Sequence, residues 1–179
     1  MTTFPLQVAL WTLLGVALLI SVVTDLARRR ILDIVTYPTM ALALGVRAGL
    51  EGLGDLERGL LSGLVGTAVG AVLFALLAWR GKGFGWGDVK LMGAVGAVFG
   101  YPLILAALVF ISLVGALQAM VSLLWQGAVW ETIFAAAQRF AAVAKLGPAL
   151  APKTRRHIPY GLAIALGSFW AMWWERTQT

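Results

Sequence analysis

The sequence predicts an all-α membrane protein, a polytopic bundle of about six transmembrane helices with an interfacial helix on the cytosolic side. Of the 179 residues, 60% are hydrophobic and only 12% are charged, a composition too apolar for a soluble domain of this size. The apolar residues form long runs, and the basic residues lie in short clusters between them. We expect residues 1–179 to form a single membrane domain.

Six apolar segments predict the transmembrane helices. The first has 19 consecutive uncharged residues, enough to cross a hydrocarbon core of about 30 Å at about 1.5 Å per residue. The fourth is short and rich in glycine. The expected spans are 6–24, 34–50, 59–79, 88–100, 102–125 and 158–174. The glycine pairs Gly66/Gly70 and Gly96/Gly100 favour close packing of the third and fourth helices.

The segment between the fifth and sixth spans, residues 126–157, repeats apolar side chains at helical spacing. This pattern favours an amphipathic helix on the membrane surface over a mobile loop.

The basic residues predict the orientation of the chain. With the N-terminus outside the cytosol, eleven Lys and Arg residues fall on the cytosolic side and three on the other. This is a strong positive-inside bias, so we expect both termini away from the cytosol. The first apolar run has no basic residue before it and no small-residue cleavage site after it, which favours a retained helix over a signal peptide.

The composition excludes several kinds of site. There is no cysteine and only one histidine, His157, so cysteine catalysis, Ser-His catalysis and multi-histidine zinc sites lack the necessary residues. The glycine-rich stretch before Asp88 fits neither common phosphate-loop pattern. The basic clusters follow membrane topology rather than a nucleic-acid-binding stripe. We expect no metal, no cofactor and no nucleic-acid partner.

Two carboxylates are expected on one membrane face. Asp25 ends the first span and Asp88 begins the fourth, and the two intervening spans return the chain to the cytosolic side. Two carboxyl groups held close together do not both ionise easily, so one keeps a proton. The ionised group can activate a water and the protonated group can donate to a peptide carbonyl, as in aspartic proteases. Which aspartate is acid and which is base stays open.

Two glycines precede the second aspartate. Gly85 and Gly87 lack a Cβ, so the backbone there can adopt positive φ and approach a substrate strand closely. Intramembrane carboxylates also serve ion pathways. The alternative to a protease is therefore a small transporter, channel or pilus-assembly scaffold that uses Asp25 and Asp88 as ion or partner contacts.

Three motifs resemble those of the type IV prepilin peptidases. GWGDVKL, residues 85–91, is similar to the family pattern G-x-G-D-x-K-L, and DLARRRILDIVTYP, residues 25–38, is similar to D-x-x-x-R-x-I-P-N-x-x-T-x-P. IPYGLAIALG, residues 158–167, is similar to I-P-[FY]-G-P-x-x-x-x-G. The resemblance implies an intramembrane GxGD aspartic endopeptidase with catalytic Asp25 and Asp88. The supporting or substrate-binding residues that it implies are Gly85, Gly87, Lys90, Pro159, Tyr160 and Gly161.

The chain departs from these patterns at two places. Leu32-Asp33 stands where the family has Pro-Asn, and Leu162 stands where it has Pro. We expect Asp33 to be a non-catalytic carboxylate near the site. Lys90 matches the family lysine, which either orients or tunes Asp88 or anchors the helix end at the membrane surface.

The resemblance also implies a substrate and a location. Members of the family remove the basic leader from prepilin-like precursors at the cytosolic face of the bacterial inner membrane, and the apolar helix of the precursor arrives through the lipid bilayer. Larger members carry paired C-x-x-C motifs and methylate the new N-terminus. Because this sequence has no cysteine, it resembles the short, peptidase-only form of tight-adherence (Flp) pilus systems, and N-methylation is not expected.

Overall fold

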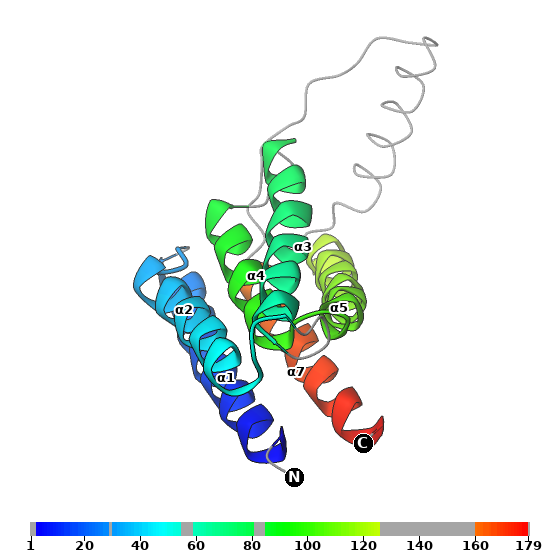
Figure 1. The fold of residues 1–179 in the computed structure, drawn as a ribbon. Helices are drawn as coiled ribbons and strands as arrows, with labels where there is room; N and C mark the ends of the chain where they lie inside the picture. Colours follow the sequence, from blue (N-terminus) through cyan, green and yellow to red (C-terminus); the bar gives the residue numbers. More distant parts are fainter. Residues whose placement is uncertain (1–2, 29, 55–58, 81–84, 126–159, 179) are drawn as a thin grey trace, which may run out of the picture. The chain divides into compact units, whose positions relative to one another are not determined.

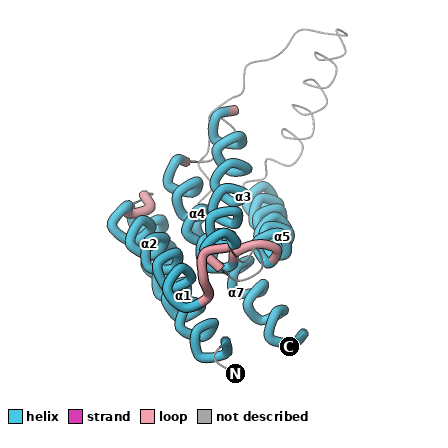
Figure 2. Tube along the Cα trace, in the orientation of Figure 1, coloured by secondary structure: helices cyan, strands magenta, loops and turns pink. Residues whose placement is uncertain are grey.

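The computed structural model describes residues 3–28, 30–54, 59–80, 85–125 and 160–178. Within these ranges the chain forms six helices and no strand (Figures 1 and 2). The helices are α1 (Thr3–Arg28), α2 (Asp33–Leu50), α3 (Leu60–Trp79), α4 (Trp86–Phe99), α5 (Leu103–Trp125) and α7 (Tyr160–Gln178). Each coincides with one predicted span to within four residues at either end, which confirms the all-helical fold class.

Three of the described helices are long and apolar enough to cross a membrane. These segments are Leu6–Arg28, Leu60–Trp79 and Leu103–Ser122. Helix α4 has 14 residues and extends about 21 Å at 1.5 Å per residue, which is shorter than a hydrocarbon core of about 30 Å. A helical membrane protein is therefore the supported class, and six crossings stay a prediction. The predicted interfacial helix, residues 126–157, lies outside the described residues.

The chain divides into two compact units. The first comprises Met1–Gly115 and Pro159–Thr179, and the second comprises Ala116–Ile158. The first unit contains helices α1 to α4, all of α7 and the larger part of α5. All contacts described below lie within this unit. A single domain over the whole chain stays a prediction.

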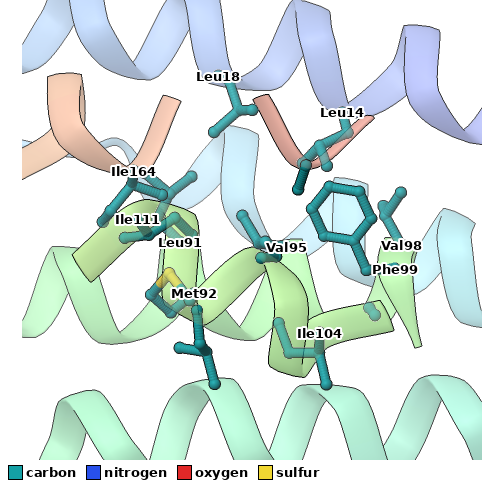
Figure 3. Close-up of a cluster of buried hydrophobic side chains, with 14 of the residues drawn as sticks. Leu14, Leu18, Leu91, Met92, Val95, Val98, Phe99, Ile104, Ile111 and Ile164 are labelled. Atoms are coloured by element: carbon teal, nitrogen blue, oxygen red, sulfur yellow. The ribbon is translucent and has the colours of Figure 1, made fainter. Parts of the chain in front are cut away.

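Helix α4 forms the centre of the first unit. Eleven of its 14 residues are buried, and it contacts α1, α2, α3 and α7. A helix enclosed on all sides is expected to be apolar around its whole circumference, as the sequence from Leu91 to Phe99 is. Figure 3 shows side chains of the core that surrounds it. They include Leu14 and Leu18 of α1, Ile104 and Ile111 of α5 and Ile164 of α7.

Helices α3 and α4 approach each other most closely where glycines face. A Cβ on Gly66 would lie 2.3 Å from the carbonyl oxygen of Gly96, and a Cβ on Gly96 would lie 2.1 Å from that of Gly66. A Cβ on Gly70 would lie 2.5 Å from the carbonyl oxygen of Met92. The glycine pairs thus let two backbones meet at distances that no side chain permits, which confirms the close packing that their spacing predicts.

The C-terminal end of α4 is held by Arg47 of α2. The last carbonyl groups of a helix lack partners within it. The buried Arg47 side chain donates from Nε to the carbonyl oxygen of Ala97 at 3.0 Å and from Nη2 to that of Val98 at 2.6 Å. Its Nη1 lies 3.3 Å from Glu51, one turn further along α2. The guanidinium therefore ties α2 to the end of α4 and satisfies carbonyls that would otherwise be unpaired.

Candidate active site

Asp25 lies on the buried face of α1, one turn before the helix ends at Arg28. The helix continues past the predicted boundary, so the aspartate is inside it rather than at its end. The side chain is only 4% exposed, and its Oδ2 accepts a hydrogen bond from the backbone N–H of Gly161 at 3.1 Å. Since Gly161 belongs to the first turn of α7, this bond joins the first and third sequence motifs.

The approach of α7 to Asp25 requires a glycine. A Cβ at Gly161 would lie 2.7 Å from Oδ2 of Asp25 and 3.3 Å from its Cβ and Cγ. Any larger residue would have to push α7 or the carboxylate away. Gly161, which the resemblance marks as a supporting residue, therefore has a steric role in the geometry.

Asp88 is the third residue of α4 and is 5% exposed. Its Oδ2 accepts a hydrogen bond from the backbone N–H of Gly85 at 2.9 Å. A carboxylate that reaches back to the residue before the helix is half of a capping box, and a negative charge in the first turn is favoured by the helix dipole. The local chain thus orients the carboxylate.

The two glycines before Asp88 do not adopt the positive φ that their lack of a Cβ permits. Gly85 is extended, with φ −90° and ψ 156°, because it is the residue that starts the helix, and Gly87 is already helical. Among the described residues, positive φ occurs at Gly52 and Gly100 instead. Gly87 contributes space, since a Cβ there would lie 3.0 Å from Cβ of Ile31. The same test at Gly85 gives only ordinary contacts, the closest being Asp88 Oδ2 at 3.6 Å.

The first turn of α7 meets both carboxylates. Gly161 binds Asp25 through its amide, and the half-buried phenol of Tyr160 lies within electrostatic reach of Asp88. Helices α1, α4 and α7 also contact one another pairwise. Asp25 and Asp88 therefore lie at the same end of the helix bundle, the arrangement that the count of spans predicts.

Lys90 pairs with the carboxylate of Asp33 rather than with that of Asp88. Its Nζ lies 2.8 Å from Oδ1 and 2.7 Å from Oδ2 of Asp33, at the start of α2. The same Nζ is 5.3 Å from the centroid of the Tyr37 ring. The sequence analysis did not connect these residues. One signal was available in the sequence. Asp33 replaces the Asn of the family pattern in the first-aspartate motif, and the second-aspartate motif carries a lysine, Lys90, that could pair with it.

A buried hydroxyl group near Asp25 also escaped the sequence analysis. Ser21 is 1% exposed and lies one helical turn before Asp25, on the same face of α1. In the part of the chain that the structure describes, its Oγ and that of Ser168 on α7 have no hydrogen-bond partner. Helical spacing from Asp25 is the signal that would have identified Ser21.

Two further expectations concern Pro159 and a possible metal site. Pro159 lies outside the described residues, so its predicted supporting role has no structural description. Within the described ranges, no group of three or more His, Cys, Asp or Glu side chains could hold a metal ion.

The arrangement of the motifs agrees with a comparison against known families. The sequence model of the type IV leader peptidase family matches residues 12–120, which include Asp25 and Asp88. Comparison with curated proteins gave no match, and comparison with solved structures gave none. Because the family match covers more than half of the 179 residues, the chain belongs to the type IV leader peptidase family.

Proposed function

We propose that this protein is a membrane-embedded aspartic endopeptidase that removes the basic leader from prepilin-like precursors at the cytosolic membrane face, without N-methylation. Family membership supports the peptidase class. One observation supports Asp25 and Asp88 as the catalytic pair. Of these two buried carboxylates, 63 residues apart in the sequence, Asp25 accepts a hydrogen bond from Gly161 in the first turn of α7, and Asp88 lies within electrostatic reach of Tyr160 in the same turn.

Burial of the two carboxylates favours a functional over a structural role. Burying a carboxylate is costly unless it is paired or hydrogen-bonded, and Asp25 and Asp88 are only 4% and 5% exposed. Buried acids are concentrated at functional sites. The site therefore resembles a reaction centre more than a structural contact.

The chemistry follows from two carboxyl groups in different protonation states. The ionised carboxylate takes a proton from a water as the water oxygen attacks the carbonyl carbon of the scissile peptide. The protonated carboxyl group donates its proton to the carbonyl oxygen and stabilises the tetrahedral intermediate. Collapse of the intermediate breaks the C–N bond. The leaving amine takes a proton from the carboxyl group that first accepted one, and a hydroxyl group of the intermediate returns a proton to the other carboxylate as the new carboxyl group forms. One water is consumed for each bond cleaved.

The backbone holds this pair in place. The N–H groups of Gly161 and Gly85 each bind one carboxylate oxygen, so neither side chain has to be reoriented for reaction. The glycine contacts with α3 and the Arg47 contacts with α2 fix the rest of α4. Such preorganisation supplies a large part of the rate enhancement of enzymes.

The charge pattern supports the proposed location. Arg28 and Arg30 follow Asp25, and Arg80 and Lys90 flank the start of α4, so basic residues adjoin the end of the bundle that carries the aspartates. By the positive-inside rule this end faces the cytosol of a bacterial inner membrane, with both termini on the opposite side.

Substitution of the aspartates tests the proposal. Asp25→Asn and Asp88→Asn should each lower cleavage of a co-expressed prepilin-like precursor by at least about 10³-fold, while Glu175→Gln, in the last turns of α7, leaves cleavage unchanged. Precursor and product are separated by gel mobility, and membrane accumulation of each variant is measured in parallel. If both Asn variants accumulate and still convert the precursor, the protease assignment fails and the transporter or scaffold alternative is favoured. The mass of the product N-terminus tests for methylation.

A further inference from the structure

The ion pair between Lys90 and Asp33 joins α4 to α2 close to the candidate active site. Lys90 donates to both oxygens of Asp33, at 2.8 Å and 2.7 Å, and lies 5.3 Å from the centre of the Tyr37 ring. Asp33 is the first residue of α2, and Lys90 is the fifth residue of α4. A single cation therefore bridges the N-terminal turns of two helices.

Lys90 is placed to act on Asp88 through the helix rather than by contact. Lys90 lies two positions after Asp88, and at 3.6 residues per turn this spacing turns the side chain about 200° around the helix axis. Tyr160 of α7 lies within electrostatic reach of Asp88, whereas Lys90 reaches Asp33 of α2. A shift of this ion pair would rotate or translate the first turn of α4, and Asp88 would move with it.

The fold does not depend on this pair. The side chains of Lys90 and Asp33 are 31% and 57% exposed, and ion pairs this accessible contribute little to stability in most proteins. The buried contacts of α4 include those at Gly96 and at the carbonyls bound by Arg47, and neither involves the pair. Near Asp88, Gly87 also lies close to Ile31, which precedes α2.

We propose that Asp33 is a positioning residue, which holds Lys90 and thereby sets the orientation of Asp88 relative to Asp25. This inference rests on the proposed peptidase function. The Leu32-Asp33 sequence stands where the related motif has Pro-Asn, so the charged pair is a feature of this chain and not of the motif. Asp33 touches neither the reacting atoms nor Asp88 in this arrangement. Its substitution should therefore change kcat rather than KM.

Kinetics of purified variants test the positioning role. Asp33→Asn and Lys90→Met should each lower kcat by about 3- to 10-fold with KM changed less than about 2-fold, because a small displacement of a catalytic group reduces turnover steeply. The double variant should be no slower than either single variant. The exchanged pair, Asp33→Lys with Lys90→Asp, should recover most of the lost kcat. Arg30→Gln, which removes an exposed cation beside the same helix without breaking the pair, should keep the original kcat.

Several outcomes overturn the inference. Single variants with the original kcat refute it, as do additive losses in the double variant or an exchanged pair that accumulates normally but stays slow.

A salt titration of the unmodified chain at saturating substrate gives an independent result. At about 1 M salt, where the Debye length is about 3 Å, kcat should fall toward that of Asp33→Asn, and an unchanged kcat contradicts the proposal. If Asp25→Asn and Asp88→Asn also remain active, the protease function itself fails. If they are inactive and Asp33→Asn is fully active, only the positioning role fails.

Discussion

The two ends of helix α4 are held in different ways. At the C-terminal end, Gly96 meets the backbone of α3, and the buried Arg47 side chain closes the last carbonyl groups. At the N-terminal end, Asp88 binds the amide of Gly85 and Lys90 forms a partly exposed ion pair. The C-terminal end is fixed by contacts from which water is excluded. The N-terminal end combines a buried carboxylate, Asp88, with an ion pair that water reaches. The comparison indicates a rigid anchor at the C-terminal end and a partly solvated contact at the N-terminal end.

Both ends nevertheless follow the same electrostatic rule. A helix carries partial positive charge at its N-terminus and partial negative charge at its C-terminus. Asp88 lies in the first turn of α4, and the Arg47 guanidinium contacts the last turn. The difference between the ends therefore lies in the exposed ion pair of the N-terminal end rather than in charge complementarity.

Breaking the anchor should have the largest effect. In Gly96→Ala the new Cβ would lie 2.1 Å from the carbonyl oxygen of Gly66, so α3 and α4 must separate. We expect a loss of about 3 kcal/mol or more in the free energy of unfolding, at the upper end of overpacking costs, together with loss of cleavage. Thermal unfolding in detergent measures the first effect.

The matched control for this change is Gly45→Ala in α2, where a Cβ would meet nothing within 4 Å. There the substitution should be neutral or stabilise the helix by up to about 1 kcal/mol. Equal unfolding temperatures for the two variants would contradict the described α3–α4 interface.

Disturbing the contact between α7 and Asp25, at the end of the bundle that carries both aspartates, should reduce activity more than stability. In Gly161→Ala the new Cβ would lie 2.7 Å from Oδ2 of Asp25, and a displacement of about 1 Å at a catalytic group lowers the rate by about 10²-fold. We expect a loss of that size in kcat with a small change in unfolding temperature. The control is Gly115→Ala on α5, whose Cβ would lie 3.8 Å from Ala163, an ordinary contact. Normal turnover in Gly161→Ala would contradict a catalytic role for Asp25.

Weakening the anchor without a steric clash should have a smaller effect that concerns mainly stability. Arg47→Met leaves the carbonyl oxygens of Ala97 and Val98 without their donor, which should cost about 2 kcal/mol or more. Glu51→Gln keeps the guanidinium in place and should cost less than about 1 kcal/mol. Chemical denaturation of both variants measures the difference, and a larger loss in Glu51→Gln would show that the ion pair, not the carbonyl contacts, holds the helix end.

The same comparison explains how much of the molecule the sequence predicts. Hydropathy identifies all six described helices because each helix is one continuous apolar run of the sequence. The glycine spacing predicts the α3–α4 contact because small residues at positions i and i+4 let two helices pack closely. The shared end of Asp25 and Asp88 follows from counting spans.

The contacts that shape the site were not predictable in this way. The bond from Gly161 to Asp25 joins residues 136 positions apart, and the pairing of Arg47 with Val98 joins residues 51 positions apart. No local pattern encodes such partners. Positive φ at Gly85, which the absence of a Cβ permits, does not occur because the residue starts a helix, and a helix start requires the extended conformation that Gly85 adopts.

The shortness of α4 has a consequence for the supply of water to the reaction. Its 14 residues extend about 21 Å, whereas a typical hydrocarbon core is about 30 Å thick. In the proposed membrane setting, α4 is enclosed by longer helices, so at least one of its ends must lie within the depth of the hydrocarbon core. Asp88 lies in the first turn of α4, and each cleavage consumes one water molecule. Water that reaches the carboxylates has to pass between the ends of the surrounding helices, and the packing of those ends thus becomes a determinant of turnover.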